Sequence, residues 1–114
     1  MTTPLPLITA LARAGALDQA MRLFQEGGYD AATSDPAALA VKGRLTKDRG
    51  LAASGGGRDA LLAEAGAAYA AADAIAPQPY LLINVATLAY LCGDTARGRA
   101  VAGEIGRASC RERV

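Results

Sequence analysis

Three charged side chains lie close together near the middle of the chain, in a stretch whose pattern predicts a helix. Arg44, Lys47 and Asp48 are three and four residues apart, so on a helix they share one face. Two cations placed in this way could hold a carboxylate through charge-assisted hydrogen bonds. The simpler alternative is a surface ion pair between Arg44 and Asp48, worth about 0.3–0.5 kcal/mol. We favour the ion pair, because helix faces commonly carry such pairs.

A second candidate is an amide in the most apolar stretch of the chain. Asn84 lies within residues 80–92, a predicted helix that is apolar nearly all round and is therefore expected to be the most buried. A buried amide needs partners, so Asn84 could hold the backbone of a bound peptide or tie the turn of a neighbouring helix pair. We favour the structural role, because buried polar groups are usually satisfied inside the protein.

The remaining residues offer little for catalysis. The 114-residue chain has no histidine, which removes the commonest general base and the commonest metal ligand. The glycines at 55–57 lack the Gly-Lys-Ser/Thr sequence and the preceding strand of a phosphate loop, so they predict a flexible turn. Cys92 has no histidine to activate it and is expected to be an inert core thiol. We therefore expect no enzyme activity, cofactor, metal ion or small-molecule substrate.

Charge and hydropathy narrow the classes of partner. The net charge of +1 gives no field for steering onto nucleic acid or an anionic membrane. The longest uncharged apolar run, residues 79–93, is too short to span a bilayer. The first residues carry no basic group before the apolar run, so we expect no secretory signal and a cytoplasmic location.

The composition favours close-packed helices over sheets. The chain is 52% hydrophobic but only 4% aromatic, so alanine and leucine must do the packing. Thr3 is expected to cap the first helix, Gly15 to end it, and residues 30–35 to form a linker. Leu39, Gly43, Leu45 and Leu51 are candidates for contact in the third helix. The expected helices are residues 4–14, 17–26, 36–53, 58–75 and 80–92, and a sixth from Ala96.

A helical repeat is indicated by residues 65–77, which read AGAAYAAADAIAP. Ala65, Tyr69 and Ala72 fall on one helix face, where the small residues let another helix approach and Tyr69 fills the gap between them. Pro77 follows the last turn. This pattern resembles the second helix of a tetratricopeptide repeat. Matching positions of two further repeats are Gly15, Leu17, Ala20 and Phe24, and then Tyr90, Gly93 and Ala100.

The resemblance covers about residues 5–103, with a second repeat stretched around the glycine run. Residues 43–45 (GRL), 47–48 (KD) and 84–88 (NVATL) resemble one subgroup, the TRAF-binding domain of apoptosis-signal kinases and of bacterial proteins. An alanine, arginine and glycine bias, expected of GC-rich DNA, favours a bacterial source.

The resemblance implies an all-α fold of about six helices, stacked as antiparallel hairpins in a right-handed α-solenoid. First helices would line a concave groove that binds a peptide or a partner helix, with Arg44, Lys47, Asp48 and Asn84 turned toward it. The alternative is a structural or regulatory segment that packs on an enzymatic or signalling domain of a longer protein. An exposed apolar strip on the sixth helix would favour that alternative.

The last eleven residues have a separate interpretation. Residues 104–114, EIGRASCRERV, resemble the one-frame translation of a common sequencing-adapter oligonucleotide. We therefore expect the helical domain to comprise residues 1–103, and the tail, with Cys110, to be non-native.

Overall fold

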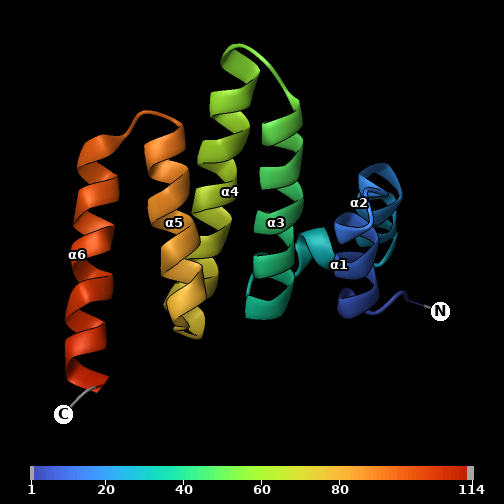
Figure 1. Cartoon of the computed structure of the whole chain (residues 1–114). Coiled ribbons are helices and arrows are strands. Elements are labelled where there is room, and N and C mark those ends of the chain that lie inside the picture. The colour runs from blue at the N-terminus through green and yellow to red at the C-terminus, as the bar shows by residue number, and fades with distance from the viewer. Residues whose placement is uncertain (1, 113–114) are drawn as a thin grey trace.

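Six α-helices follow one another in antiparallel pairs, and Figure 1 shows α3 to α6 side by side with the first pair at one end. The computed structural model describes the backbone of residues 2–112 and the side chains of residues 2–107. All regular elements in this part of the chain are helical, which confirms the all-α prediction. They are α1 (Leu5–Arg13), α2 (Leu17–Glu26), the 3-10 helix η1 (Tyr29–Ala31), α3 (Pro36–Ala52), α4 (Gly56–Ile75), α5 (Pro79–Leu91) and α6 (Thr95–Glu112).

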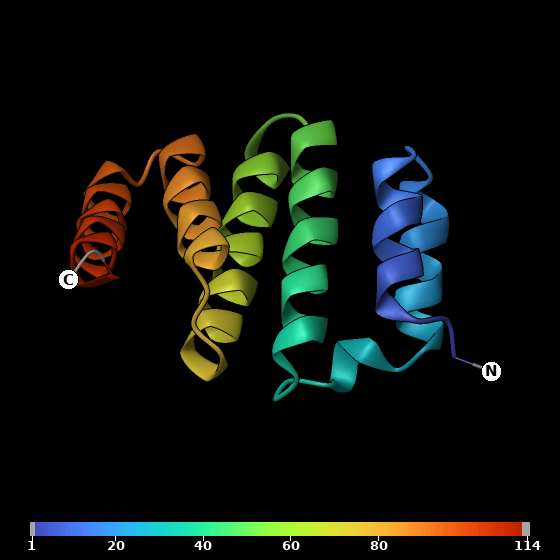
Figure 2. The ribbon, with the colours of Figure 1, turned by 60° about the horizontal axis from the view of Figure 1, so that its bottom comes forward.

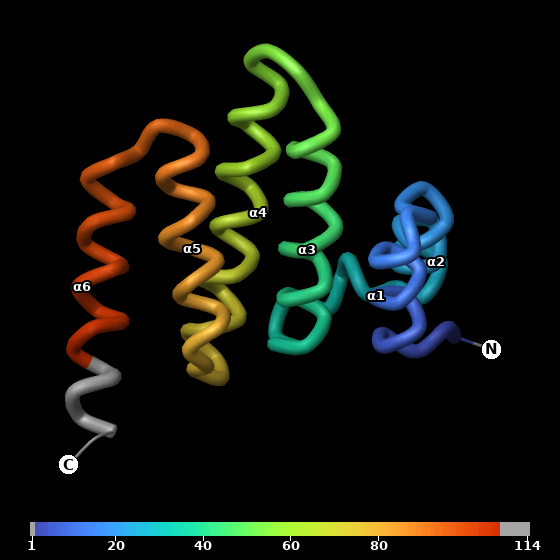
Figure 3. Tube along the Cα trace, viewed as in Figure 1, coloured from blue at the N-terminus to red at the C-terminus, as the bar shows by residue number. Residues whose placement is uncertain are grey.

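The connections alternate between the two ends of the row. In Figure 3 the turns within the second and third pairs lie at the top, and the connection between these pairs lies at the bottom. The first helices of these pairs, α3 and α5, therefore run parallel to each other. None of the helices described is both long and apolar enough to cross a membrane.

Glycine ends the first helix of two pairs in the same way. Gly15 and Gly93 both have φ of +87°, a left-handed conformation that glycine adopts without steric cost. Ala16 N–H then donates to Leu11 C=O at 2.9 Å, and Asp94 N–H donates to Ala89 C=O at 2.8 Å. Each turn thus provides a hydrogen-bond donor to a backbone carbonyl that the end of the helix would leave without a partner. The predicted ends of these two helices are confirmed.

Two separate clusters of buried side chains form the core. The first pair surrounds Ile8, Ala20 and Phe24, which Leu45 of α3 joins. Figure 2 shows this pair at one end of the row, connected to α3 through η1. The larger cluster lies within α3 to α6 and consists of Leu39, Leu62, Ala65, Tyr69, Ala72, Leu81, Val85, Ala86, Leu88 and Val101.

Tyr69 packs at the contact between α3 and α4, as the repeat pattern predicts. Its side chain is 4% exposed, and Ala65 and Ala72 on either side are fully buried. A Cβ atom added at Gly43 would lie 2.9 Å from Cδ2 of Tyr69, closer than real Cβ atoms approach. The absence of a side chain at Gly43 therefore creates the space that the tyrosine ring occupies.

Several predicted details at helix starts are wrong. Pro4, not Thr3, is the N-cap of α1, and the backbone carbonyl of Thr3 instead accepts a hydrogen bond from the Tyr29 hydroxyl at 2.7 Å. η1 occupies the start of the expected linker, and α4 begins at Gly56 rather than near residue 58. The predicted start of α3 is confirmed, because the Asp35 carboxylate accepts from the Ala37 N–H at 3.0 Å.

The helix expected at residues 80–92 is α5, and five of its 13 residues are buried, yet it is not buried all round. Tyr80, Ile83, Tyr90 and Leu91 of α5 are 44–51% exposed. The reason is that the helices packed against α5, α4 and α6, cover only part of its surface. Leu51, an expected contact residue of α3, is likewise exposed, and the thiol of Cys92 is only partly buried.

α6 continues across Glu104, the expected start of the tail, as one uninterrupted helix to Glu112. Ile105 is partly buried against the larger core cluster. The side chain of Cys110 lies outside the described residues.

Candidate partner-binding site

The main candidate site is a cleft of about 290 Å³ that the first helices of all three pairs line. α1 contributes Thr9 and Arg13, and the second-layer helix α4 contributes only Tyr69. Three of the four predicted site residues line this cleft and Asp48 does not. The remaining lining residues are Ala40, Val41, Arg44 and Lys47 of α3, and Tyr80 and Asn84 of α5.

The face that α3 presents to the cleft follows from helical spacing. Ala40, Arg44 and Lys47 are four and three residues apart, so they lie along one side of the helix. Leu39, Gly43 and Leu45 point into the protein and are buried. The apolar side of α3 thus packs against the protein, and Arg44 and Lys47 lie on the side that faces the cleft.

Lys47 and Asn84 meet across the cleft, although they are 37 residues apart in the sequence. Nζ of Lys47 donates a hydrogen bond to Oδ1 of Asn84 at 3.2 Å. Nδ2 of Asn84 donates in turn to the backbone carbonyl of Tyr80 at 2.9 Å. The amide therefore ties α5 to α3 and to its own first turn, while its side chain stays only partly buried.

Arg44 and Asp48 form a long ion pair, with Nε of Arg44 3.8 Å from Oδ2 of Asp48. Nε of Arg44 is buried and makes no hydrogen bond within the described residues. Nε itself is buried and cannot reach an anion in the cleft, so only the terminal N–H groups of the guanidinium can donate to one. The ion pair with Asp48 orients the Arg44 side chain and does not use all of its hydrogen-bond donors.

Tyr69 lies beneath the two cations of α3. Burial raises the pKa of Tyr69 from 10.0 to about 12, a rise that Asp48 reinforces and the charge of Arg44 partly opposes. Nζ of Lys47 is 6.0 Å from the centroid of the Tyr69 ring, at the outer limit of a cation–π contact. The phenol thus stays neutral at physiological pH and gives the cleft an aromatic surface.

Arg13 is the site residue that sequence reasoning missed. It brings a third cation into the cleft from the first pair, and the described lining contains no acidic side chain. Arg13 follows Thr9 by four residues, as Arg44 follows Ala40 and Asn84 follows Tyr80. This repeated spacing on successive first helices is the signal that could have identified it.

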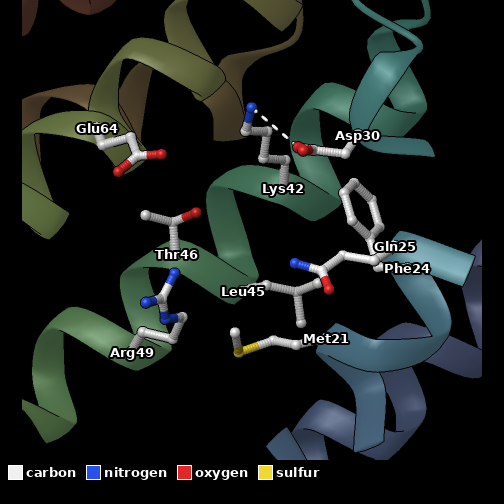
Figure 4. A pocket seen from close by; sticks show the side chains of 9 residues that line it. All are labelled: Met21, Phe24, Gln25, Asp30, Lys42, Leu45, Thr46, Arg49 and Glu64. Atoms are coloured by element: carbon white, nitrogen blue, oxygen red, sulfur yellow. Dashed lines mark ion pairs between the residues drawn. The ribbon is translucent and has the colours of Figure 1, made fainter. Parts of the chain in front are cut away.

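A second cleft, of about 160 Å³, lies between α2, α3 and α4 and is drawn in Figure 4. Nζ of Lys42 is 3.1 Å from Oδ1 of Asp30, and this ion pair joins α3 to η1. Arg49 and Glu64 add one charge of each sign, with Thr46 between them in Figure 4. This cleft therefore carries both signs of charge.

A third cleft, of about 240 Å³, lies between α4, α5 and α6 and is lined mainly by small and aliphatic side chains. Sγ of Cys92 reaches it and lies 3.5 Å from the backbone oxygen of Ala89. Within the described residues, no three His, Cys, Asp or Glu side chains are grouped as metal ligands.

Paired antiparallel helices, with first helices lining a common cleft, define a helical-repeat protein of the tetratricopeptide type. A family model described as Tetratricopeptide Repeats-Sensor (TPR-S) matches residues 6–89, from α1 through most of α5, and the chain belongs to this family. No curated protein and no solved structure matches the chain. The fold is therefore a helical-repeat scaffold of a kind commonly used for protein interaction.

Proposed function

We propose that the chain is a protein-interaction module that binds an acidic peptide, or an acidic segment of a partner helix, in the cleft of α1, α3 and α5. The observation that carries the proposal is the convergence of Arg13, Arg44 and Lys47 on a cleft whose lining, among the described residues, includes no acidic side chain. Repeat scaffolds present such concave surfaces to extended or helical partners. The word sensor in the family description is in keeping with detection of a partner.

Each predicted residue has a distinct part in this proposal. Arg44 supplies terminal N–H groups of its guanidinium to a carboxylate, and Lys47 supplies the donors that Asn84 does not use. Asn84 holds Lys47 in place from α5. Asp48 orients the Arg44 side chain and, as an anion beside the cleft, limits how many acidic groups can enter.

The proposal is tested with a double variant, Arg44→Ala with Lys47→Ala. Binding of an acidic peptide should be lost, and binding by the parent should weaken as salt is raised, because the contacts are charge-assisted. The matched control is Arg22→Ala, which removes a cation that is 67% exposed on α2, outside the cleft. Equal affinity of the parent and the double variant, with equal melting temperatures, would remove the cleft from the binding function.

The alternative, a structural segment that packs on another domain of a longer protein, was expected to show an exposed apolar strip on α6. The exposed positions of α6 up to residue 107 are instead Thr, Ala, Gly, Arg and Glu. The large exposed apolar side chains of the described residues lie on α1, α3, α4 and α5. The interaction module is therefore the better supported proposal.

The finer assignments stay part of the same proposal. They are the closer relation to TRAF-binding domains, a bacterial source, work in the cytoplasm, and an adapter-derived origin of residues 104–114. Amplification of the locus from source DNA tests the last of these, because genomic codons for all eleven residues would refute an adapter origin.

A further inference from the structure

The smaller cleft between α2, α3 and α4 lies on the other side of α3 from the cleft of the proposed function. Lys42, Thr46 and Arg49 are four and three residues apart, so they share one face of α3. Arg44 lies about 200° around the helix from Lys42, because each residue turns the chain by about 100°. The cleft of about 160 Å³ is therefore a separate place on the molecule, which the binding of an acidic peptide does not use.

A buried hydroxyl lies at the floor of this cleft. Thr46 is 6% exposed, it lines the cleft, and its hydroxyl oxygen points into the cleft in Figure 4. The hydroxyl of Thr87, by comparison, donates to the backbone carbonyl of Ile83 in its own helix at 2.8 Å. No such bond holds the Thr46 hydroxyl within the described residues, so its donor and acceptor are directed at the cleft. Because buried polar groups normally have partners, Thr46 indicates a site for a polar ligand.

Two opposite charges stand on either side of this hydroxyl without neutralising each other. Arg49 extends from α3 and Glu64 from α4, with Thr46 between them in Figure 4. Neither Arg49 nor Glu64 forms an ion pair in the part of the chain that the structure describes. The other two charged groups of the lining, Lys42 and Asp30, are 3.1 Å apart and compensate each other. The cleft thus presents one cation, one carboxylate and a hydroxyl between them.

We propose that this cleft binds a small zwitterion, namely an α-amino acid with a short apolar side chain. An anion is attracted by Arg49 and repelled by Glu64, and a cation experiences the reverse, so only a molecule with both charges gains from both residues. The ligand carboxylate accepts hydrogen bonds from Arg49, and the ligand ammonium donates to Glu64. The Thr46 hydroxyl bonds to the ligand between these two groups.

The size and the apolar part of the cleft determine the kind of amino acid. Met21 and Phe24 of α2 and Leu45 of α3 provide apolar surface beside the charged groups. A cavity of about 150 Å³ holds a molecule of the size of benzene, so a cleft of about 160 Å³ has room for an amino acid of the size of alanine or valine. A tryptophan side chain would extend beyond the cleft.

Titration of the nitrogen-15-labelled chain, followed by nuclear magnetic resonance, measures the binding. The probes are L-alanine, propionate, which lacks the ammonium group, and ethylamine, which lacks the carboxylate. L-Alanine should shift the backbone amide signals of Thr46, Arg49 and Glu64 with a dissociation constant of about 1 mM, the range expected of a ligand this small. Propionate and ethylamine should each bind about tenfold more weakly, because each lacks one charged contact.

Three variants assign the contacts. Glu64→Gln should abolish the advantage of L-alanine over propionate, and Arg49→Gln should abolish its advantage over ethylamine. Thr46→Val keeps the shape of the side chain and should weaken L-alanine binding about fivefold, the effect of one hydrogen bond. The matched controls, Asp59→Asn on α4 and Arg22→Gln on α2, change exposed charges outside the cleft and should leave binding unchanged. Circular dichroism melting of every variant shows whether a loss of affinity is a loss of fold.

The outcomes decide the inference without deciding the proposed function. Equal affinity for L-alanine and propionate would make the cleft an anion site, and equal affinity for L-alanine and ethylamine a cation site, so either result overturns the inference. It is also overturned if about 50 mM L-alanine causes no shift, or if Glu64→Gln and Arg49→Gln leave L-alanine binding unchanged. Arg44→Ala with Lys47→Ala should leave L-alanine binding intact, and its loss in that variant would place the amino acid in the other cleft and overturn the inference.

Discussion

The close contact between Gly43 and Tyr69 makes a quantitative prediction about stability. In Gly43→Ala the new Cβ would lie 2.9–3.1 Å from three atoms of the Tyr69 ring. The ring is 4% exposed and cannot swing into solvent, so the helices must shift. Overpacking of this kind costs about 1–3 kcal/mol, whereas alanine gains about 1 kcal/mol over glycine in a helix interior. We expect a net loss of up to about 2 kcal/mol.

Gly66→Ala is the matched control for this change. Gly66 also lies inside a helix, but its new Cβ would meet only Cβ of Leu88, at 3.8 Å, which is an ordinary contact. This variant should gain about 0.5–1 kcal/mol from helix propensity alone. The two substitutions are chemically identical, so the difference between them isolates the tight fit of Tyr69 against Gly43.

Urea unfolding of the parent and both variants, followed by circular dichroism, measures these free energies. Thermal melts should separate the two variants by several degrees, since about 1 kcal/mol corresponds to roughly 4 °C in a domain of this size. The reasoning would be refuted if Gly43→Ala were as stable as Gly66→Ala. That result would mean that the ring of Tyr69 has room to move away from α3.

Three further predictions concern a phenol, an ion pair and a turn. Burial raises the pKa of Tyr69 from its ordinary value of 10.0 to about 12, so the stability of the folded state should fall as pH rises from about 10 to 12. The fall should be smaller in Tyr69→Phe, and absorbance near 295 nm reports the titration. Lys42→Gln, which breaks the partly exposed pair with Asp30, should cost at most about 1 kcal/mol, and melts in high salt should abolish the difference. Gly93→Ala places a side chain at φ +87° and should cost about 1–2 kcal/mol in urea unfolding; an unchanged midpoint would contradict the left-handed turn.

The candidate site could be predicted only in part from the sequence. Arg44, Lys47 and Asp48 were identified because residues three and four apart on a helix share a face. The hydrogen bond between Lys47 and Asn84 could not be predicted, because the two residues are 37 apart in the sequence and meet only through the packing of α3 and α5 against α4. Arg13 was missed for the same reason, since its place in the cleft depends on how the first pair stacks against α3.

The sequence by itself determined the helices, their pairing in hairpins and the burial of Tyr69. These features follow from local signals, namely apolar spacing, capping residues and glycines that turn the chain, each of which acts within a few residues. Only the tertiary structure decided which faces remain exposed. α5 is apolar nearly all round, yet one side is open because burial depends on which helices lie beside it, and Thr3 accepts a bond from Tyr29 rather than capping its own helix.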